Sequence, residues 1–172
     1  FVDAKPGDRY KAIEGFLQVL NLAPDFPDAL RRLGSCLISS GNTEEGLSYI
    51  SSAYRLDPSP ANQSAYALGL LMRGNEGDAQ MAFNLAQQAS ESDPDDLYYH
   101  FVLFEAAIMT RNDSYVISEA NQILTLAPED PESHYFMSLA YAYQGEMSSS
   151  LAELKEARKL GLPEEDYQSA LE

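Results

Sequence analysis

Two histidines are the residues of this sequence best suited to metal or acid–base chemistry. His100 and His134 lie 34 residues apart, and an imidazole can ligate a metal ion or transfer a proton near neutral pH. A metal site needs further ligands that converge on the histidines, and the sequence offers neither a paired cysteine motif nor two histidines one helical turn apart. We therefore expect both side chains to pack between helices, and we predict no metal site and no bound cofactor.

Acidic pairs form the second group that could carry chemistry. Asp95-Asp96 and Glu164-Glu165 each follow a proline at the expected start of a helix, where carboxylates cap the helix and interact favourably with its positive end. The sequence contains no glycine-rich phosphate loop, no G-x-S-x-G nucleophile elbow and no H-E-x-x-H metal motif. The lone cysteine, Cys36, lies in an apolar helical stretch that favours a buried thiol. We predict that the chain is not an enzyme and has no catalytic residue.

Charge restricts the classes of partner. Lysine and arginine total 11 against 27 aspartates and glutamates, which gives a formal net charge of −16. No basic stripe offsets this charge, so we expect neither a nucleic acid nor an anionic membrane surface as a partner. No apolar run approaches the roughly 20 residues that span a bilayer, and no signal-peptide pattern is visible, so we expect a cytoplasmic location. Both ends look cut, and we interpret the chain as a piece of a longer protein.

The elements that must position these residues are marked by a repeat of prolines. Pro24, Pro58, Pro94, Pro128 and Pro163 follow one another at steps of 34, 36, 34 and 35 residues. Proline cannot continue the interior of a helix, so each one predicts the end of one helix and the link to the next.

A second break is predicted halfway through each period, because turn dipeptides or close variants recur there. They are Gly7-Asp8, Gly41-Asn42, Gly74-Asn75, Asn112-Asp113 and Gly145-Glu146. The segments between breaks are 12 to 16 residues long, are rich in Ala, Leu, Glu and Gln, and carry apolar residues at helical spacing. The chain is therefore predicted to be all-α, an α-solenoid of ten short antiparallel helices of which the last is truncated.

The residues within each period resemble those of tetratricopeptide repeats. In that family the first helix carries a large residue, a Leu-Gly pair and another large residue, and the second helix carries a small-large-small set followed by proline. The matching sets are Leu30, Leu33-Gly34, Leu37, Gly46, Ile50, Ala53; Ala65, Leu68-Gly69, Met72, Ala82, Ala86, Ala89; His100, Leu103-Phe104, Ala107, Val116, Ala120, Ile123; and His134, Met137-Ser138, Tyr141, Ser150, Leu154, Ala157. In the third set, Phe104 takes the small site and Ala107 the large one, which we interpret as an exchange of volume.

The resemblance implies a right-handed superhelix of antiparallel helix pairs in a single domain, residues 1–172. It implies a half-repeat at 1–26, full repeats at 27–60, 61–96, 97–130 and 131–163, and the start of a further or capping helix at 164–172. It also places His100 and His134 where a large packing residue normally lies.

A binding groove is the function that the resemblance implies, because the first helix of each pair lines the concave surface in arrays of this family. We expect a peptide or helix of another protein there, with acidic groups against the arginines of the first repeats and apolar or aromatic anchors on the aromatic side chains of the later ones. Val102 and Phe136 either join this surface or pack between repeats. The predicted groove residues are Arg31, Arg32, Ser35, Tyr66, Leu70, Arg73, Tyr98, Phe101, Glu105, Tyr135, Leu139 and Tyr143.

Two other functions stay open at this point. The chain could be a self-assembly module whose end helices stack on another copy, or the recruiting or regulatory arm of a larger enzyme. The lysine and asparagine clamp that chaperone-tail binders of this family carry is largely missing, because the matching positions hold Arg31, Ser35, Ala67, Tyr98 and Val102. The asparagine ladder of arrays that feed a sugar-transfer enzyme is missing as well.

Overall fold

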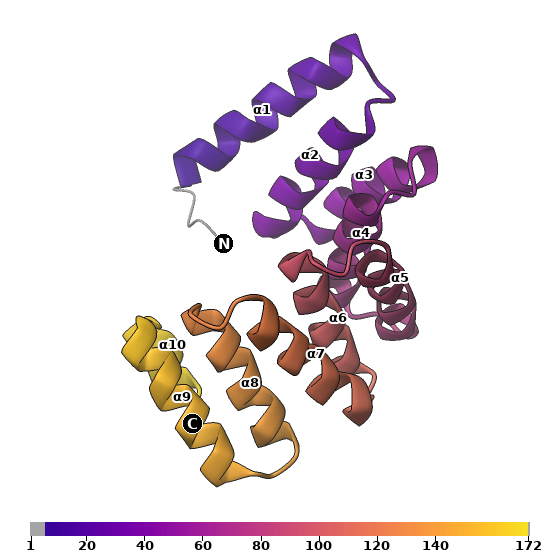
Figure 1. Ribbon diagram of the computed structural model, residues 1–172. Helices are drawn as coiled ribbons and strands as arrows, with labels where there is room; N and C mark the ends of the chain where they lie inside the picture. Colours follow the sequence, from indigo (N-terminus) through magenta and orange to yellow (C-terminus); the bar gives the residue numbers. More distant parts are fainter. Residues whose placement is uncertain (1–5, 172) are drawn as a thin grey trace. The chain divides into compact units, whose positions relative to one another are not determined.

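The structure, a computed structural model, describes residues 6–171 and contains ten α-helices and no strand within that range (Figure 1). The predicted all-α fold and its number of helices are thus confirmed. The chain divides into two compact units, one that ends at Asp93 and one that starts at Pro94. They are called unit 1 and unit 2 below, and each is described by itself. No helix of the described residues is both long and apolar enough to cross a membrane.

Unit 1 holds five helices joined by short turns: α1 (Pro6–Leu22), α2 (Pro27–Ser39), α3 (Thr43–Leu56), α4 (Pro60–Arg73) and α5 (Asp78–Ser92). The predicted break at Gly7-Asp8 lies inside the first turn of α1, because that helix already begins at Pro6. Proline suits the first turn of a helix, where its missing N–H has no partner to lose. The turns after α2 and α4 use glycines with left-handed backbone, Gly41 at φ 87° and Gly74 at φ 69°.

Unit 2 also holds five helices: α6 (Leu97–Met109), α7 (Asp113–Leu126), α8 (Pro131–Tyr143), α9 (Met147–Leu160) and the short α10 (Glu164–Ser169). The capping role predicted for the acidic pair before α6 is confirmed, since the Oδ1 atom of Asp96 accepts a hydrogen bond from the backbone N–H of Tyr98 at 2.9 Å. Asp130 caps α8 in the same way. Glu164 begins α10 and forms an ion pair with Arg158 at 2.9 Å.

The tightest helix crossing of unit 1 joins α2 and α3. A Cβ atom added to Gly34 would lie 2.5 Å from the carbonyl oxygen of Gly46, and one added to Gly46 would lie 2.5 Å from the carbonyl oxygen of Gly34. Backbone thus meets backbone, and the buried Leu33 and Ile50 fill the space beside the crossing. This contact explains why both positions of the first full repeat hold glycine.

Gly34→Ala is expected to lower the free energy of unfolding of unit 1 by about 1–3 kcal/mol, because the helices must separate to admit the methyl group. Gly15→Ala is the matched control: its Cβ would meet nothing within 4 Å, so alanine should raise that free energy by about 0.5–1 kcal/mol through its better helix propensity. Urea unfolding followed by circular dichroism measures both changes. Equal stabilities of the two variants would contradict the close crossing.

Helix α4 is shifted by two residues from its predicted register. Its small buried site is Ala67 and its large one is Leu70, which is 1% exposed, whereas Met72, predicted at the large site, is 59% exposed. Gly74, which ends α4, lies 33 residues after Gly41, the glycine in the turn that follows α2. The buried alanines of α5 instead lie 36 residues after the buried residues of α3 to which they correspond, Gly46, Ile50 and Ala53. The extra residues lie in the turn between α4 and α5. The offset of 35 residues that the predicted set implies between α2 and α4 was therefore wrong, whereas the offset of 36 residues between α3 and α5 agrees with the buried alanines of α5.

The exchange of volume proposed for the third repeat is compatible with the packing of unit 2. Phe104 is 1% exposed and Ala107 is fully buried. The Phe104 ring lies with its edge against Phe136, with ring centroids 5.2 Å apart and planes at 89°. An edge-to-face pair of this kind is a favourable aromatic arrangement.

Candidate functional site

The first two predicted groove arginines share one carboxylate in unit 1. Arg31 forms an ion pair with Asp28, and the Nε atom of Arg32 donates to the Oδ2 atom of Asp28 at 2.8 Å. Burial alone raises the pKa of Asp28, but hydrogen bonds from Arg32 and Arg31 and their charges outweigh burial and lower the pKa. Two guanidinium groups against one carboxylate leave a net positive charge on this stretch of α2. Ser35 is exposed one turn further on and donates to the carbonyl oxygen of Arg31 at 3.0 Å.

Arg73, the third predicted groove arginine, is held by the turn between α4 and α5. Its Nε and Nη2 atoms donate to the two carboxylate oxygens of Asp78 at 2.8 and 2.7 Å. The same carboxylate accepts from the backbone N–H of Asn75, and Glu44 lies 3.9 Å from the guanidinium. The hydrogen bond to Asp78 raises the pKa of Arg73 and lowers that of the buried Asp78. This arginine fixes a turn and leaves little charge for a partner.

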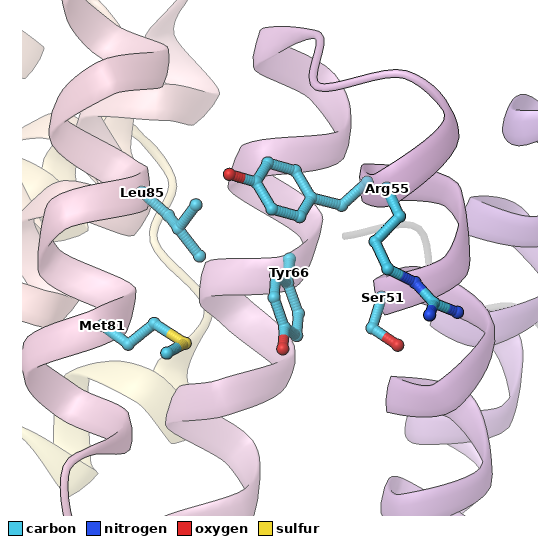
Figure 2. A pocket seen from close by; sticks show the side chains of 6 residues that line it. Ser51, Arg55, Tyr66, Met81 and Leu85 are labelled. Carbon is cyan, nitrogen blue, oxygen red and sulfur yellow. The ribbon is translucent and has the colours of Figure 1, made fainter.

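Because of the register shift, Leu70 and Tyr66 lie on different sides of α4 from those predicted for the groove. Leu70 is a core residue and is not available at a surface. Tyr66 points into a hollow of about 500 Å³ between the second helices α3 and α5 (Figure 2). The hollow, here called the α3–α5 hollow, is lined by Ser51, Tyr54, Arg55, Tyr66, Met81 and Leu85. Sequence reasoning missed it because the assumed register turned Tyr66 to the opposite side of α4.

Helix α6 carries the exposed aromatic surface of unit 2. Tyr98, Phe101, Glu105 and Met109 follow one another at steps of three or four residues, so they share one helix face. Met109 is 58% exposed, Tyr98 is exposed, and Phe101 is half-buried and stacks on Phe136 of α8 with ring centroids 4.7 Å apart. Desolvation raises the pKa of Glu105, although its side chain still reaches solvent. The α6 face, as this set of four residues is called below, consists of three predicted groove residues and Met109.

The three predicted groove residues of α8 have different surroundings. Tyr135 is half-buried and packs on the core cluster of Leu154, Ala157, Leu162 and Tyr167; burial and the charge of Asp166 raise its pKa. The hydroxyl of Tyr143 donates to Asp113 at the start of α7 at 3.0 Å. Leu139 is half-buried. Val102 is buried and belongs to the core.

Both histidines lie in the same hydrogen-bonded arrangement, one in each repeat of unit 2. The Nδ1 atom of His100 lies 2.6 Å from Glu119 Oε2, and its Nε2 atom lies 2.9 Å from the carbonyl oxygen of Pro94. The corresponding distances are 2.7 Å from His134 to Glu153 and 3.1 Å from His134 to Pro128. A carboxylate and a carbonyl both accept hydrogen bonds, so this geometry suits a ring that donates from both nitrogens.

The pairing has a consequence for the charge of the first histidine. The hydrogen bond to Glu119 raises the pKa of His100, burial lowers it and the Pro94 carbonyl raises it again, so that the pKa lies above its usual value. Each glutamate follows its histidine by 19 residues, a spacing that was visible in the sequence and was missed. Among residues 6–171 no group of three or more histidine, cysteine or acidic side chains is placed to hold a metal ion. The histidines thus join each first helix to its second helix.

Comparison with known proteins identifies the fold. The chain matches no family model and no curated protein sequence. Solved structures do match: TTC0263, a thermophilic TPR protein of Thermus thermophilus, shares 19% identity and a TM-score of 0.81 over 96% of this chain and 91% of that one. YrrB, described as a TPR protein with an unusual peptide-binding site, shares 15% identity and a TM-score of 0.72 over 96% and 84%. A crystal structure of MamA shares 18% identity and a TM-score of 0.71 over 90% and 89%.

These similarities, together with the helix pairs, show that the chain has the tetratricopeptide-repeat fold that the sequence resembled. At these identities the shared property is the fold, and a fold by itself does not define a partner.

Proposed function

We propose that this protein is a non-catalytic scaffold that binds a segment of another protein through the α6 face of unit 2. The observation that carries the proposal is the run of exposed or half-exposed side chains Tyr98, Phe101 and Met109 on one side of a first helix. Aromatic and methionine side chains on a surface are typical anchors for protein partners. The stacking of Phe101 on Phe136 holds one of these anchors in a fixed orientation.

The partner is a peptide or helix with apolar or aromatic anchors. Glu105 lies in the middle of the α6 face and is exposed, so its carboxylate can accept a hydrogen bond from a donor of the partner. In unit 1, taken by itself, Arg31 and Arg32 keep a net positive charge beside Asp28, which suits an acidic group of a protein partner bound to that unit. The similarity to YrrB, described as having a peptide-binding site, supports a peptide as the kind of ligand.

Selection of peptides from a phage-displayed library on the folded chain, followed by calorimetric affinity measurement, tests the proposal. We expect Phe101→Ala to weaken the best peptide about tenfold or more, as for a central interface anchor. Met109→Ala should also weaken it. Met147→Ala is the matched control, because Met147 in α9 is 63% exposed, close to the 58% of Met109, and lies outside the α6 face. A peptide that binds all three variants as tightly as the unchanged chain would overturn the proposal.

A further inference from the structure

Three hollows surround the exposed side of α3 in unit 1 and adjoin one another. The α3–α5 hollow shares Ser51 and Tyr66 with a hollow of about 270 Å³ that also includes Glu44 and Arg73. It shares Arg55 with a hollow of about 390 Å³ on the side of Pro24. The α3–α5 hollow therefore has a neighbouring hollow on each side along α3.

The walls of the α3–α5 hollow are apolar and adaptable. The rings of Tyr54 and Tyr66 lie with centroids 5.5 Å apart. Leu85 is buried and stands on one side of Tyr66, with Ser51 on the other side (Figure 2). Met81, on the same helix as Leu85, is 50% exposed (Figure 2). A flexible methionine beside aromatic rings accommodates varied apolar side chains and makes favourable sulfur–aromatic contacts. A volume of about 500 Å³ is ample for one large side chain of a partner.

The rim of the hollow carries a cation without an ion-pair partner among residues 6–171. The Nη2 atom of Arg55 donates to the hydroxyl of Ser52 at 3.1 Å, and no described carboxylate lies within 4.0 Å of its guanidinium. Arg31, Arg32, Arg73 and Arg158 each have such a carboxylate. Asp25 lines the adjoining hollow together with Arg55 but stays beyond ion-pair distance. In a chain of net charge −16, a guanidinium left unpaired beside an apolar hollow complements an anionic group.

We propose that the α3–α5 hollow is a second binding site, which takes an internal, extended segment of a partner protein with an acidic residue two positions before an aromatic residue. Residues two apart point to the same side of an extended chain. The carboxylate is then placed to meet Arg55 while the aromatic ring enters between Tyr66, Met81 and Leu85. This site lies on second helices of unit 1, and it is separate from the α6 face assigned above.

The test uses two acetylated, amidated pentapeptides, Ser-Glu-Ser-Phe-Ser and its analogue with glutamine in place of glutamate. Selective ¹³C-methyl labelling of methionine gives one signal for each of the five methionines, and Met81 is the one in the hollow. We expect the glutamate peptide to shift the Met81 signal saturably and to bind about tenfold more tightly than the glutamine peptide, as a charge-assisted hydrogen bond predicts.

Arg55→Gln should bind the two peptides equally, because it removes only the charge that distinguishes them. Lys155→Gln, which removes an exposed positive charge in unit 2, should keep the preference for glutamate. Arg55 is exposed, so its substitution leaves the core intact, and a circular dichroism spectrum checks this. An unmoved Met81 signal, or a preference for glutamate that persists in Arg55→Gln, would overturn the inference. A shift of Met109 alone would overturn it too while leaving the proposed function in place.

Discussion

Phe104→Ala is expected to lower the free energy of unfolding of unit 2 by about 3–5 kcal/mol, the range observed when a buried phenylalanine is truncated. Phe104 is 1% exposed and meets Phe136 edge to face, so alanine leaves a cavity and removes an aromatic contact between α6 and α8. Hydrogen exchange of the α6 and α8 amides measures the loss of stability within unit 2. A global unfolding curve does not isolate this loss, because the chain has two compact units.

Two further variants show whether the loss at Phe104 has the proposed cause. Met109→Ala in the same helix should change stability by less than about 0.5 kcal/mol, because that side chain is largely exposed. Adding Ala107→Leu to Phe104→Ala should recover part of the loss if positions 104 and 107 exchange volume. A loss below about 1 kcal/mol for Phe104→Ala would contradict the packing described for unit 2.

His100→Leu is expected to cost about 3–5 kcal/mol at neutral pH, because it leaves the buried Glu119 carboxylate without its partner. His100→Leu combined with Glu119→Leu removes both groups and should be clearly more stable than the single variant, since a paired charge can be replaced by apolar side chains at little cost. The same hydrogen-exchange measurement follows both variants. A double variant no more stable than His100→Leu would contradict the pairing.

The same pair gives unit 2 a pH dependence with a defined sign. The pKa of His100 is raised in the folded protein above an unfolded value of about 6.5. Its stabilising contribution is therefore complete below about pH 6.5 and is lost as the pH rises through the folded-state pKa. Stability measured between pH 5.5 and 9 should decline on the alkaline side, and His100→Gln should reduce this decline. An unchanged slope in His100→Gln would show that another group causes it.

Much of the fold was accessible from local chemistry. Proline and glycine positions located the helix ends, and the capping role of Asp96 followed from its place before α6. The pairing of Arg31 and Arg32 with Asp28 was also accessible, because the three residues lie at the i, i+3 and i+4 positions of one helix. It was missed because the arginines were considered only as partners for a ligand.

Other features depended on information that no local pattern holds. The turn between α4 and α5 absorbs three extra residues, so the offset of α4 differs from that of α5, and Leu70 and Tyr66 were assigned to the wrong side of their helix. The two histidine–glutamate pairs join different helices. The packing of Tyr135 on α9 and the segment around α10 likewise depends on tertiary contacts, which sequence spacing on α8 alone does not specify.

The most direct test of a binding surface on α6 is an NMR measurement of intermolecular NOEs. It uses the ¹³C-labelled chain and the unlabelled peptide that has the highest affinity in the library selection. We predict NOEs from the peptide to the methyl group of Met109 and to the ring of Phe101. NOEs confined to other helices, with none to these two side chains, would contradict the proposed function.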